Sequence, residues 1–180
     1  LKHSNLIDVK IEKANILDLY SGIGSFGLEC ISRGAKKVTF IEKDRSALNI
    51  LKENCIKLSI VNQTMLLNDK IENILIKNNK DKYSIFFLDP PFSDKEFIQN
   101  LNLIKKKKIY ENKHIVIIHR EKNSNDELIN IFIKDRNGSL NTLVSEAEGS
   151  KNTTIIAKRG FVDRKKLILF EGIIQTLNKK

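Results

Sequence analysis

The sequence has no tryptophan, a single methionine, and only two prolines and two cysteines among its 180 residues. Two isolated thiols, Cys30 and Cys55, do not make the disulfide framework of a small secreted protein, so we expect a reducing, cytoplasmic compartment. No apolar run approaches the roughly 20 residues that a membrane-spanning helix needs. We therefore expect no membrane among the partners of this protein.

Acidic residues are in the minority, with 22 against 32 lysines and arginines, which gives a formal net charge of +10. A surplus of this size predicts a polyanionic partner such as a nucleic acid. Only six of the basic residues are arginine, however, and lysine, asparagine and isoleucine are all abundant. An AT-rich genome encodes the same excess of lysine, asparagine and isoleucine at surface positions that tolerate substitution. The charge alone therefore leaves both explanations open.

Strand-like and helix-like segments alternate along the chain, which is typical of a parallel α/β sheet. We expect strands at 15–19, 38–42, within 59–67, 83–88 and 114–119. We expect helices at 26–32, 44–58, 69–77, from about 94, and at 125–134. After the turn signal Asn137-Gly138, an antiparallel pair is expected at 139–146 and 152–158. Residues 1–180 are one domain's length, so we expect a single domain, with an unplaced basic tail at 160–180. We also expect a monomer.

The stretch DLYSGIGSFG begins at Asp18, near the end of the first expected strand, and continues into the loop after it. Its glycines at 22, 24 and 27 match the G-x-G-x-x-G pattern of a nucleotide-binding turn at a helix N-terminus. Glu42, at the end of the second expected strand, is placed to accept hydrogen bonds from ribose hydroxyls. These features fit a dinucleotide and a methyl donor equally well.

Asp18 separates the two ligands, because a carboxylate beside the loop should repel a pyrophosphate. S-adenosylmethionine has no phosphate and carries an ammonium and a sulfonium that a carboxylate can pair with. The turn at Gly22 and Gly24 lets the backbone approach such a ligand closely. Asp18 therefore favours a methyl donor, and the alternative is that Asp18 only caps the following helix.

A second motif, Asp89-Pro90-Pro91-Phe92, follows the buried strand YSIFFL and should lie at the carboxyl edge of the sheet. The two prolines remove backbone donors and stiffen the loop. The Asp89 side chain and the Pro90 carbonyl then form an acceptor-rich pocket for an exocyclic amine, and Phe92 offers a ring on which a base can stack. The alternative for this motif is an ordinary strand-ending turn.

The run DLYSGIGSFGLECISRGAKKVTFIEKD, together with LDPPF, resembles the bacterial RsmD family over roughly residues 1–120. The resemblance implies a Rossmann-like class I methyltransferase fold, a mostly parallel seven-stranded sheet with an antiparallel C-terminal hairpin. It implies S-adenosylmethionine as cofactor, no metal, and methylation of a guanine N2 amine in 16S ribosomal RNA, free or in the assembling small subunit. The cofactor contacts that we expect are Asp18, Tyr20, Ser21, Gly22, Gly24, Glu42, Lys43, Asn68 and Asp69, and the catalytic residues are Asp89, Pro90, Pro91 and Phe92.

Two regions depart from the family pattern. Members usually begin with a basic hairpin and an R-P-T helix, whereas this chain opens at LKHSNLI, so we expect residues 1–13 to be the remnant of that helix. The usual tyrosine-glycine of the last hairpin is not found. The alternative functions are a DNA adenine-N6 or cytosine-N4 methyltransferase, a truncated RNA-binding relic without turnover, and a dehydrogenase.

Overall fold

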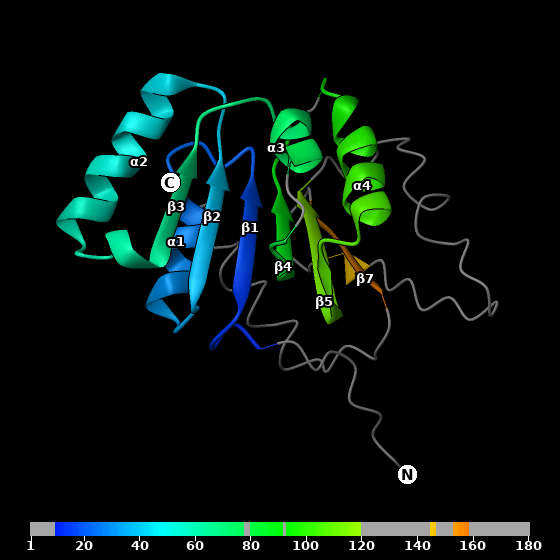
Figure 1. Cartoon of the computed structure of the whole chain (residues 1–180), viewed down its shortest axis with the longest axis horizontal. Helices are drawn as coiled ribbons and strands as arrows, with labels where there is room; N and C mark the ends of the chain where they lie inside the picture. The colour runs from blue at the N-terminus through cyan, green and yellow to red at the C-terminus, as the bar shows by residue number, and fades with distance from the viewer. Residues whose placement is uncertain (1–9, 78–79, 92, 120–144, 147–152, 159–180) are drawn as a thin grey trace, which may run out of the picture.

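Strands and helices alternate from Asn15 to His119 in the computed structural model (Figure 1). The structure describes residues 10–77, 80–91, 93–119, 145–146 and 153–158. The elements are β1 (Asn15–Leu19), α1 (Ser25–Ser32), β2 (Lys37–Ile41), α2 (Arg45–Lys57), a 3-10 turn at Val61–Gln63, β3 (Thr64–Leu67), α3 (Ile71–Lys77), β4 (Tyr83–Leu88), α4 (Glu96–Lys107), β5 (Tyr110–His119), β6 (Ser145–Glu146) and β7 (Thr153–Lys158).

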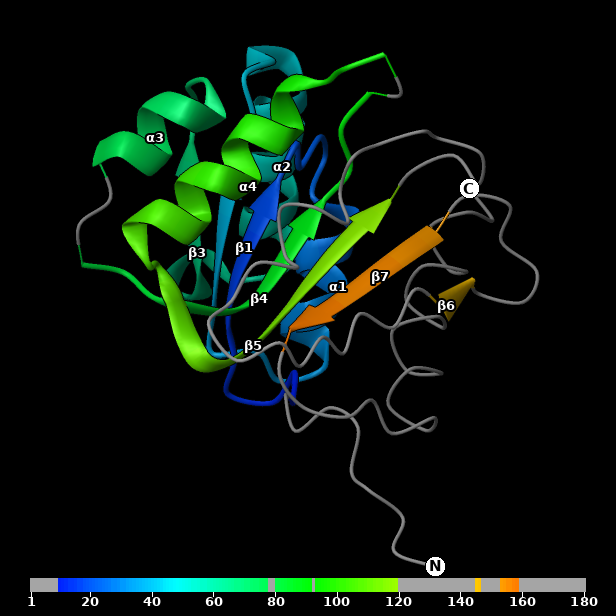
Figure 2. The ribbon, with the colours of Figure 1, turned by 90° about the vertical axis from the view of Figure 1, so that its right-hand side faces the viewer.

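All the strands belong to one sheet with the order β3-β2-β1-β4-β5-β7-β6. Strands β1 to β5 run parallel, while β7 runs antiparallel to β5 and pairs with the two-residue strand β6 (Figure 2). The order reverses between β1 and β4, and ligands of open α/β sheets bind at the carboxyl ends of strands beside such a reversal. The predicted parallel α/β fold is confirmed.

Two apolar clusters cover the two faces of the sheet. Helices α1 and α2 pack on one face, where Phe26 of α1 stacks on Phe87 of β4 with ring centroids 3.9 Å apart. Helices α3 and α4 pack on the other face, against alternate residues of the same strands. Every residue of β4 is buried, as the continuous apolar run YSIFFL predicts. The core therefore fixes the central strands from both sides and sets where their carboxyl ends lie.

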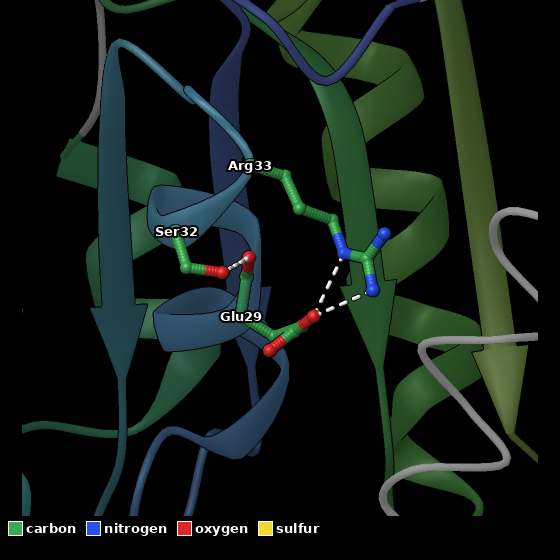
Figure 3. A network of polar contacts seen from close by, with 3 residues as sticks. All are labelled: Glu29, Ser32 and Arg33. Carbon is green, nitrogen blue, oxygen red and sulfur yellow. Dashed lines mark hydrogen bonds and ion pairs between the residues drawn. The ribbon is translucent and has the colours of Figure 1, made fainter.

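The helix ends are fixed by local contacts. Asp44 caps α2, because its Oδ1 accepts hydrogen bonds from the backbone N–H of Ser46 at 2.7 Å and of Ala47 at 3.2 Å. At the C-terminal end of α1, the Arg33 side chain pairs with Glu29 one turn earlier, with Nη2 2.6 Å from Oε1 (Figure 3). This pair is partly exposed, so it contributes little to stability.

Several boundaries differ from the sequence-based expectation. Strand β5 begins at Tyr110 rather than at residue 114, because polar residues 111–113 lie at an irregularity in its pairing with β4 and hide the strand pattern. The third strand lies within the expected range, at Thr64–Leu67 after a 3-10 turn, whereas the helices expected from 69 and 94 begin two residues later. The antiparallel pairing of β6 with β7 is confirmed.

Some expectations concern residues outside the described ranges: the helix at 125–134, residues 139–144 and the tail at 160–180. Of the expected N-terminal helix remnant, only residues 10–13 are described, and they form a bend and a turn. Among the described helices, none combines the length and the apolar composition that crossing a membrane would require.

Gly27 tests how tightly α1 packs on the sheet. A Cβ at this position would lie 2.3 Å from Cε1 of Phe40 and 2.8 Å from Cγ1 of Val38. We expect Gly27→Ala to lower the free energy of unfolding by about 1–3 kcal/mol, measured by urea denaturation. Phe40→Leu should partly relieve the clash, so the double variant should lose less stability than the sum of the two single losses. Additive losses would contradict this packing argument.

Candidate functional site

The residues that follow four adjacent strands meet at the carboxyl edge of the sheet. Tyr20 follows β1, Glu42 follows β2, Asn68 follows β3 and Asp89 follows β4. Backbone hydrogen bonds continue the sheet into these loops, with Glu42 N–H donating to Leu67 O at 3.1 Å. Segments separated by up to about seventy positions in the sequence therefore form one site.

A cavity of about 330 Å³ opens at this edge. It contains two of the predicted catalytic residues, Asp89 and Pro91, together with part of the predicted cofactor set. The lining is formed by Tyr20, Ile41, Glu42, Lys43, Asp69, Lys70, Ile71, Glu72, Asp89, Pro91, Asp94, Glu96 and Asn100. Its volume lies at the small end of the range for small-molecule sites.

Carboxylates dominate the cavity wall. Six of the lining residues are acidic and only two, Lys43 and Lys70, are basic, although the whole chain carries a net charge of +10. A concave surface of this composition attracts a ligand that carries positive charge and disfavours a phosphate. The cavity therefore agrees with the interpretation of Asp18 as a marker against a pyrophosphate-bearing ligand.

Asp18 lies within β1 and is 1% exposed. Its Oδ2 accepts a hydrogen bond from the backbone N–H of Gly27 at 3.0 Å, in the first turn of α1. Its Oδ1 is buried and has no hydrogen-bond partner. The bond to the first turn of α1 is what the helix-capping alternative predicts, whereas the role of Asp18 toward a methyl donor stays a prediction.

Burial raises the pKa of the Asp18 carboxyl well above its ordinary range. The Gly27 N–H opposes this by stabilising the ionised form, while the negative charges of Asp89 and Glu42 raise the pKa further. A cation beside Oδ1 would favour ionisation and reverse part of the shift. Asp18 itself is buried and does not line the cavity, so a role toward a ligand stays a prediction.

Glu42 joins the first two loops. Its Oε2 accepts a hydrogen bond from the Gly22 N–H at 2.7 Å, and its Oε1 accepts one from the Asp44 N–H at 2.8 Å. The Asn68 side-chain amide donates to the backbone oxygens of Glu42 at 2.9 Å and of Lys43 at 3.1 Å. Asn68 thus fixes the loop after β2 from outside the cavity lining, whereas Glu42 and Lys43 line the cavity themselves.

Different local constraints require a glycine at the two positions of the first loop, Gly24 and Gly22. Gly24 has φ +84° and lies under Leu51, whose Cδ1 would be 2.3 Å from an added Cβ. Gly22 has φ +53°, and an added Cβ would meet nothing within 4 Å. The backbone conformation of Gly22 therefore explains the glycine, and the space beside it is open. Ser21 is tied to the sheet instead, since its N–H donates to Ile41 O at 3.2 Å.

The loop after β4 presents Asp89 and Pro91 at the surface and buries Pro90 between them. The Asp89 N–H lies 3.4 Å from Leu19 O, which continues the pairing of β4 with β1, and the Asp94 N–H donates to Pro91 O at 2.8 Å. Phe92, the predicted stacking residue, lies outside the described residues.

The structure thus divides the predicted site residues. Six line the cavity: Tyr20, Glu42, Lys43, Asp69, Asp89 and Pro91. The remaining described ones lie around it and hold the loops: Asp18, Ser21, Gly22, Gly24, Asn68 and Pro90. Their individual roles toward a ligand stay predictions.

Sequence reasoning missed seven lining residues: Ile41, Lys70, Ile71, Glu72, Asp94, Glu96 and Asn100. Most of them lie at the starts of α3 and α4. Because these helices begin just after the loops that follow β3 and β4, the positions of the loops could have indicated these lining residues. Asn100 had a separate signal, because it is a polar residue at a buried position among apolar neighbours of α4. Within the residues that the structure describes, no cluster of His, Cys, Asp and Glu could hold a metal ion.

Asp18 leads to a pH-dependent prediction. Because its raised pKa makes the folded state bind more protons than the unfolded state, the free energy of unfolding should fall as pH rises from about 4. Asp18→Asn removes this titration and can keep the bond from Gly27. Urea denaturation should therefore show the variant gaining stability relative to wild type between about pH 4 and neutrality. A difference that does not change with pH would contradict the prediction.

Several curated relatives of this chain carry the name ribosomal RNA small subunit methyltransferase D. The ribosomal RNA small subunit methyltransferase D of Buchnera aphidicola subsp. Baizongia pistaciae is 36% identical over 116 residues, which are 64% of this chain and 58% of that protein. The protein of the same name from Haemophilus influenzae is 37% identical over 84 residues, 46% of this chain and 44% of its own. The chain thus spans about half the length of these relatives.

The fold is also found among solved structures. A Haemophilus influenzae protein provisionally described as a methylase superposes with a TM-score of 0.59 at 31% identity, covering 63% of this chain and 66% of that one. The family model described as Conserved hypothetical protein 95 matches residues 2–144. Since that match includes most of the chain and all four strand ends of the site, this protein belongs to the Conserved hypothetical protein 95 family, that of the RsmD methyltransferases.

Proposed function

We propose that this protein transfers a methyl group from S-adenosylmethionine to the N2 amine of a guanine in small-subunit ribosomal RNA. The observation that carries the proposal is that one cavity is lined by Glu42 and Asp69, which follow β2 and β3, and by Asp89 and Pro91, which follow β4. It offers adjoining places for a nucleoside-bearing cofactor and for a target amine. The names of the relatives support ribosomal RNA as the substrate class.

The residues present fit S-adenosylmethionine. The Oδ1 of Asp18 is a buried acceptor without a partner, the space beside Gly22 is open, and the cavity wall is acidic. Glu42 would hold the ribose hydroxyls, and Asp69 with Ile71 would flank the adenine. When bound, the cofactor supplies an electrophilic methyl group. A dinucleotide fits poorly, because its pyrophosphate would face six carboxylates and two lysines.

The loop after β4 would receive the amine. Asp89 is exposed at the cavity, so its carboxylate can accept an N–H of the target and later take up its proton, directly or through water. Pro90 would add its backbone carbonyl as a second acceptor, and Pro91 would form the wall. In this proposal Phe92 stacks on the flipped base. Holding the amine in one orientation supplies much of the catalysis.

Two alternatives remain open to experiment. A DNA adenine-N6 or cytosine-N4 methyltransferase uses a similar acceptor pocket, but the relatives support RNA instead. A non-catalytic RNA-binding relic would keep the fold without turnover. The net charge of +10 suits either nucleic acid and does not separate these possibilities.

A methylation assay with labelled cofactor separates the substrates. Ribosomal RNA, assembled small subunits and free DNA would be offered side by side, and the modified base identified by mass spectrometry. We expect N2-methylguanine in ribosomal RNA or in the particle. Label only in DNA adenine would overturn the proposal. Calorimetry with S-adenosylhomocysteine tests the alternative of a non-catalytic relic. If that alternative is right, a folded sample should show no binding.

Asp89→Ala should lower kcat at least about 100-fold, because the amine loses its charged acceptor. Affinity for S-adenosylhomocysteine should change little, since the proposed cofactor contacts are left in place. Glu53→Ala is the matched control, because it removes an exposed carboxylate from helix α2, away from the cavity. Equal activities of the two variants would rule out the role proposed for Asp89.

A further inference from the structure

A second cavity lies at the amino edge of the sheet, where the parallel strands begin. This amino-edge cavity has a volume of about 410 Å³ and lies at the end of the sheet opposite to the proposed methyl-transfer site. Its lining includes the lysines Lys37, Lys80 and Lys82 and the acids Asp81 and Glu111. Among the described residues, the two cavities share no lining residue.

Two buried hydroxyl groups also line the amino-edge cavity. Thr39 of β2 is 3% exposed and Tyr83 of β4 is 6% exposed. The Tyr83 hydroxyl donates to Oγ1 of Thr39 at 3.4 Å, which leaves the hydroxyl hydrogen of Thr39 able to donate to a ligand. Lysine ammonium groups together with hydroxyl donors are a combination that proteins use to bind phosphate oxygens. The cavity therefore suits an anion such as a phosphate group.

A row of lysines extends from this cavity across the sheet. Lys13 precedes β1, Lys37 begins β2, Lys82 precedes β4 and Lys108 precedes β5. These four strands are neighbours, in the order β2-β1-β4-β5. Because adjacent strands lie about 4.8 Å apart, the backbone of this lysine row spans about 14 Å. That length can follow several phosphates of one nucleic-acid strand.

Lysines outnumber acids at this edge. The segments 12–15, 36–37, 80–83 and 108–111 together contain six lysines and three acids. The last turn of α4 adds the lysines at 105–107. The lining of the cavity at the carboxyl edge has the opposite balance, with six acids and two lysines. Positive and negative charges are therefore separated along the direction of the strands.

Codon bias does not by itself explain the lysine row. Lys13 and Lys108 hold left-handed backbone conformations, with φ of +62° and +53°. Asparagine adopts this conformation more readily than lysine does, and an AT-rich genome encodes asparagine as well. Interaction with a helix dipole can account for the lysines at 105–107, but not for Lys37 and Lys82, which lie where strands begin.

The acidic cavity at the carboxyl edge is unsuited to the backbone of a nucleic acid. Phosphate contacts supply much of the affinity of proteins for nucleic acids, and they fix its position on the protein. Phosphates would be disfavoured among the six carboxylates of that cavity. A protein that acts on RNA therefore needs basic groups elsewhere on its surface, and the amino edge provides such groups beside two hydroxyls.

We propose that the amino edge binds the phosphate backbone of RNA. One phosphate would lie in the amino-edge cavity, held by Lys37, Lys82 and the hydroxyl of Thr39, and its neighbours would follow the lysine row. The surface would hold a segment of the RNA away from the target base, so it adds affinity and does not select the base. Its assignment to ribosomal RNA rests on the proposed function, whereas the binding of an RNA backbone does not.

Fluorescence anisotropy with labelled oligouridylate tests this surface. This RNA contains no guanine, so its binding does not depend on a target amine. In Lys37→Gln/Lys82→Gln we expect binding to be weaker by roughly threefold to tenfold. The slope of log affinity against log salt should be less steep by about 1.4, about 0.7 for each lysine. Thr39→Val should weaken binding by roughly threefold to tenfold without changing the slope, because it removes a hydrogen-bond donor and no charge.

Arg45→Gln/Lys52→Gln is the matched control. It also removes two positive charges, from exposed residues of α2 that do not line the amino-edge cavity. Binding should then stay within about twofold of wild type. Equal losses in the two double variants would indicate an effect of net charge alone and overturn the proposal. Unchanged binding by folded Lys37→Gln/Lys82→Gln or Thr39→Val would also overturn it.

Inorganic phosphate distinguishes an RNA backbone from a free anion. At constant ionic strength it should displace oligouridylate only weakly, because one phosphate replaces one of several contacts. Calorimetric binding of inorganic phosphate to the wild-type protein, together with oligouridylate binding that does not depend on Lys37 and Lys82, would indicate a site for a small anion. That result would overturn the proposal.

Kinetics with ribosomal RNA provide a second readout. Lys37→Gln/Lys82→Gln should raise KM for the RNA and leave kcat within about twofold of wild type, because the surface binds ground state and transition state equally. A lower kcat with an unchanged KM would overturn the proposal. A wild-type protein that methylates no RNA would refute the proposed function, while oligouridylate binding would still decide the role of the amino edge.

Discussion

The hydrogen bond from the Gly27 N–H to a carboxylate buried inside the sheet is the contact on which the site depends. Asp18 carries a potential negative charge where a strand would normally place an apolar residue, and burial makes that charge unfavourable. The N–H of α1 compensates for one oxygen only. The carboxylate thus anchors the helix beneath the glycine loop while keeping capacity for a ligand. Packing of Gly27 against Phe40 keeps the helix close enough for this bond to form.

The overall charge of the molecule and the charge of its cavity have opposite signs. The chain as a whole is basic, whereas acidic residues outnumber basic ones by six to two in the lining of the cavity at the carboxyl edge. A polyanion would be attracted over long range by the overall charge, yet its phosphates would be disfavoured inside the cavity. Under the proposed function, such an arrangement would admit an uncharged base and a cationic cofactor while keeping the backbone of the nucleic acid outside.

The sequence was sufficient for the central architecture because strong local signals agreed there with the packing. YSIFFL is apolar throughout and became a fully buried strand, and Asp44 capped its helix as its position indicated. Strand β5 was placed too short because residues 111–113 are polar and irregularly paired. The contact of Tyr20 with Asn100 could not be predicted, since it depends on how α4 lies against the end of β1.

The placement of the site on four strand ends also has a consequence for how it comes into being during folding. Loops after β1, β2, β3 and β4 meet only when these parallel strands have paired, and parallel pairing joins segments distant in sequence. A nascent chain that still lacks one of these strands cannot present the complete cavity. A ligand that fills it would therefore recognise only chains whose central sheet is finished, and would shift the folding equilibrium towards them.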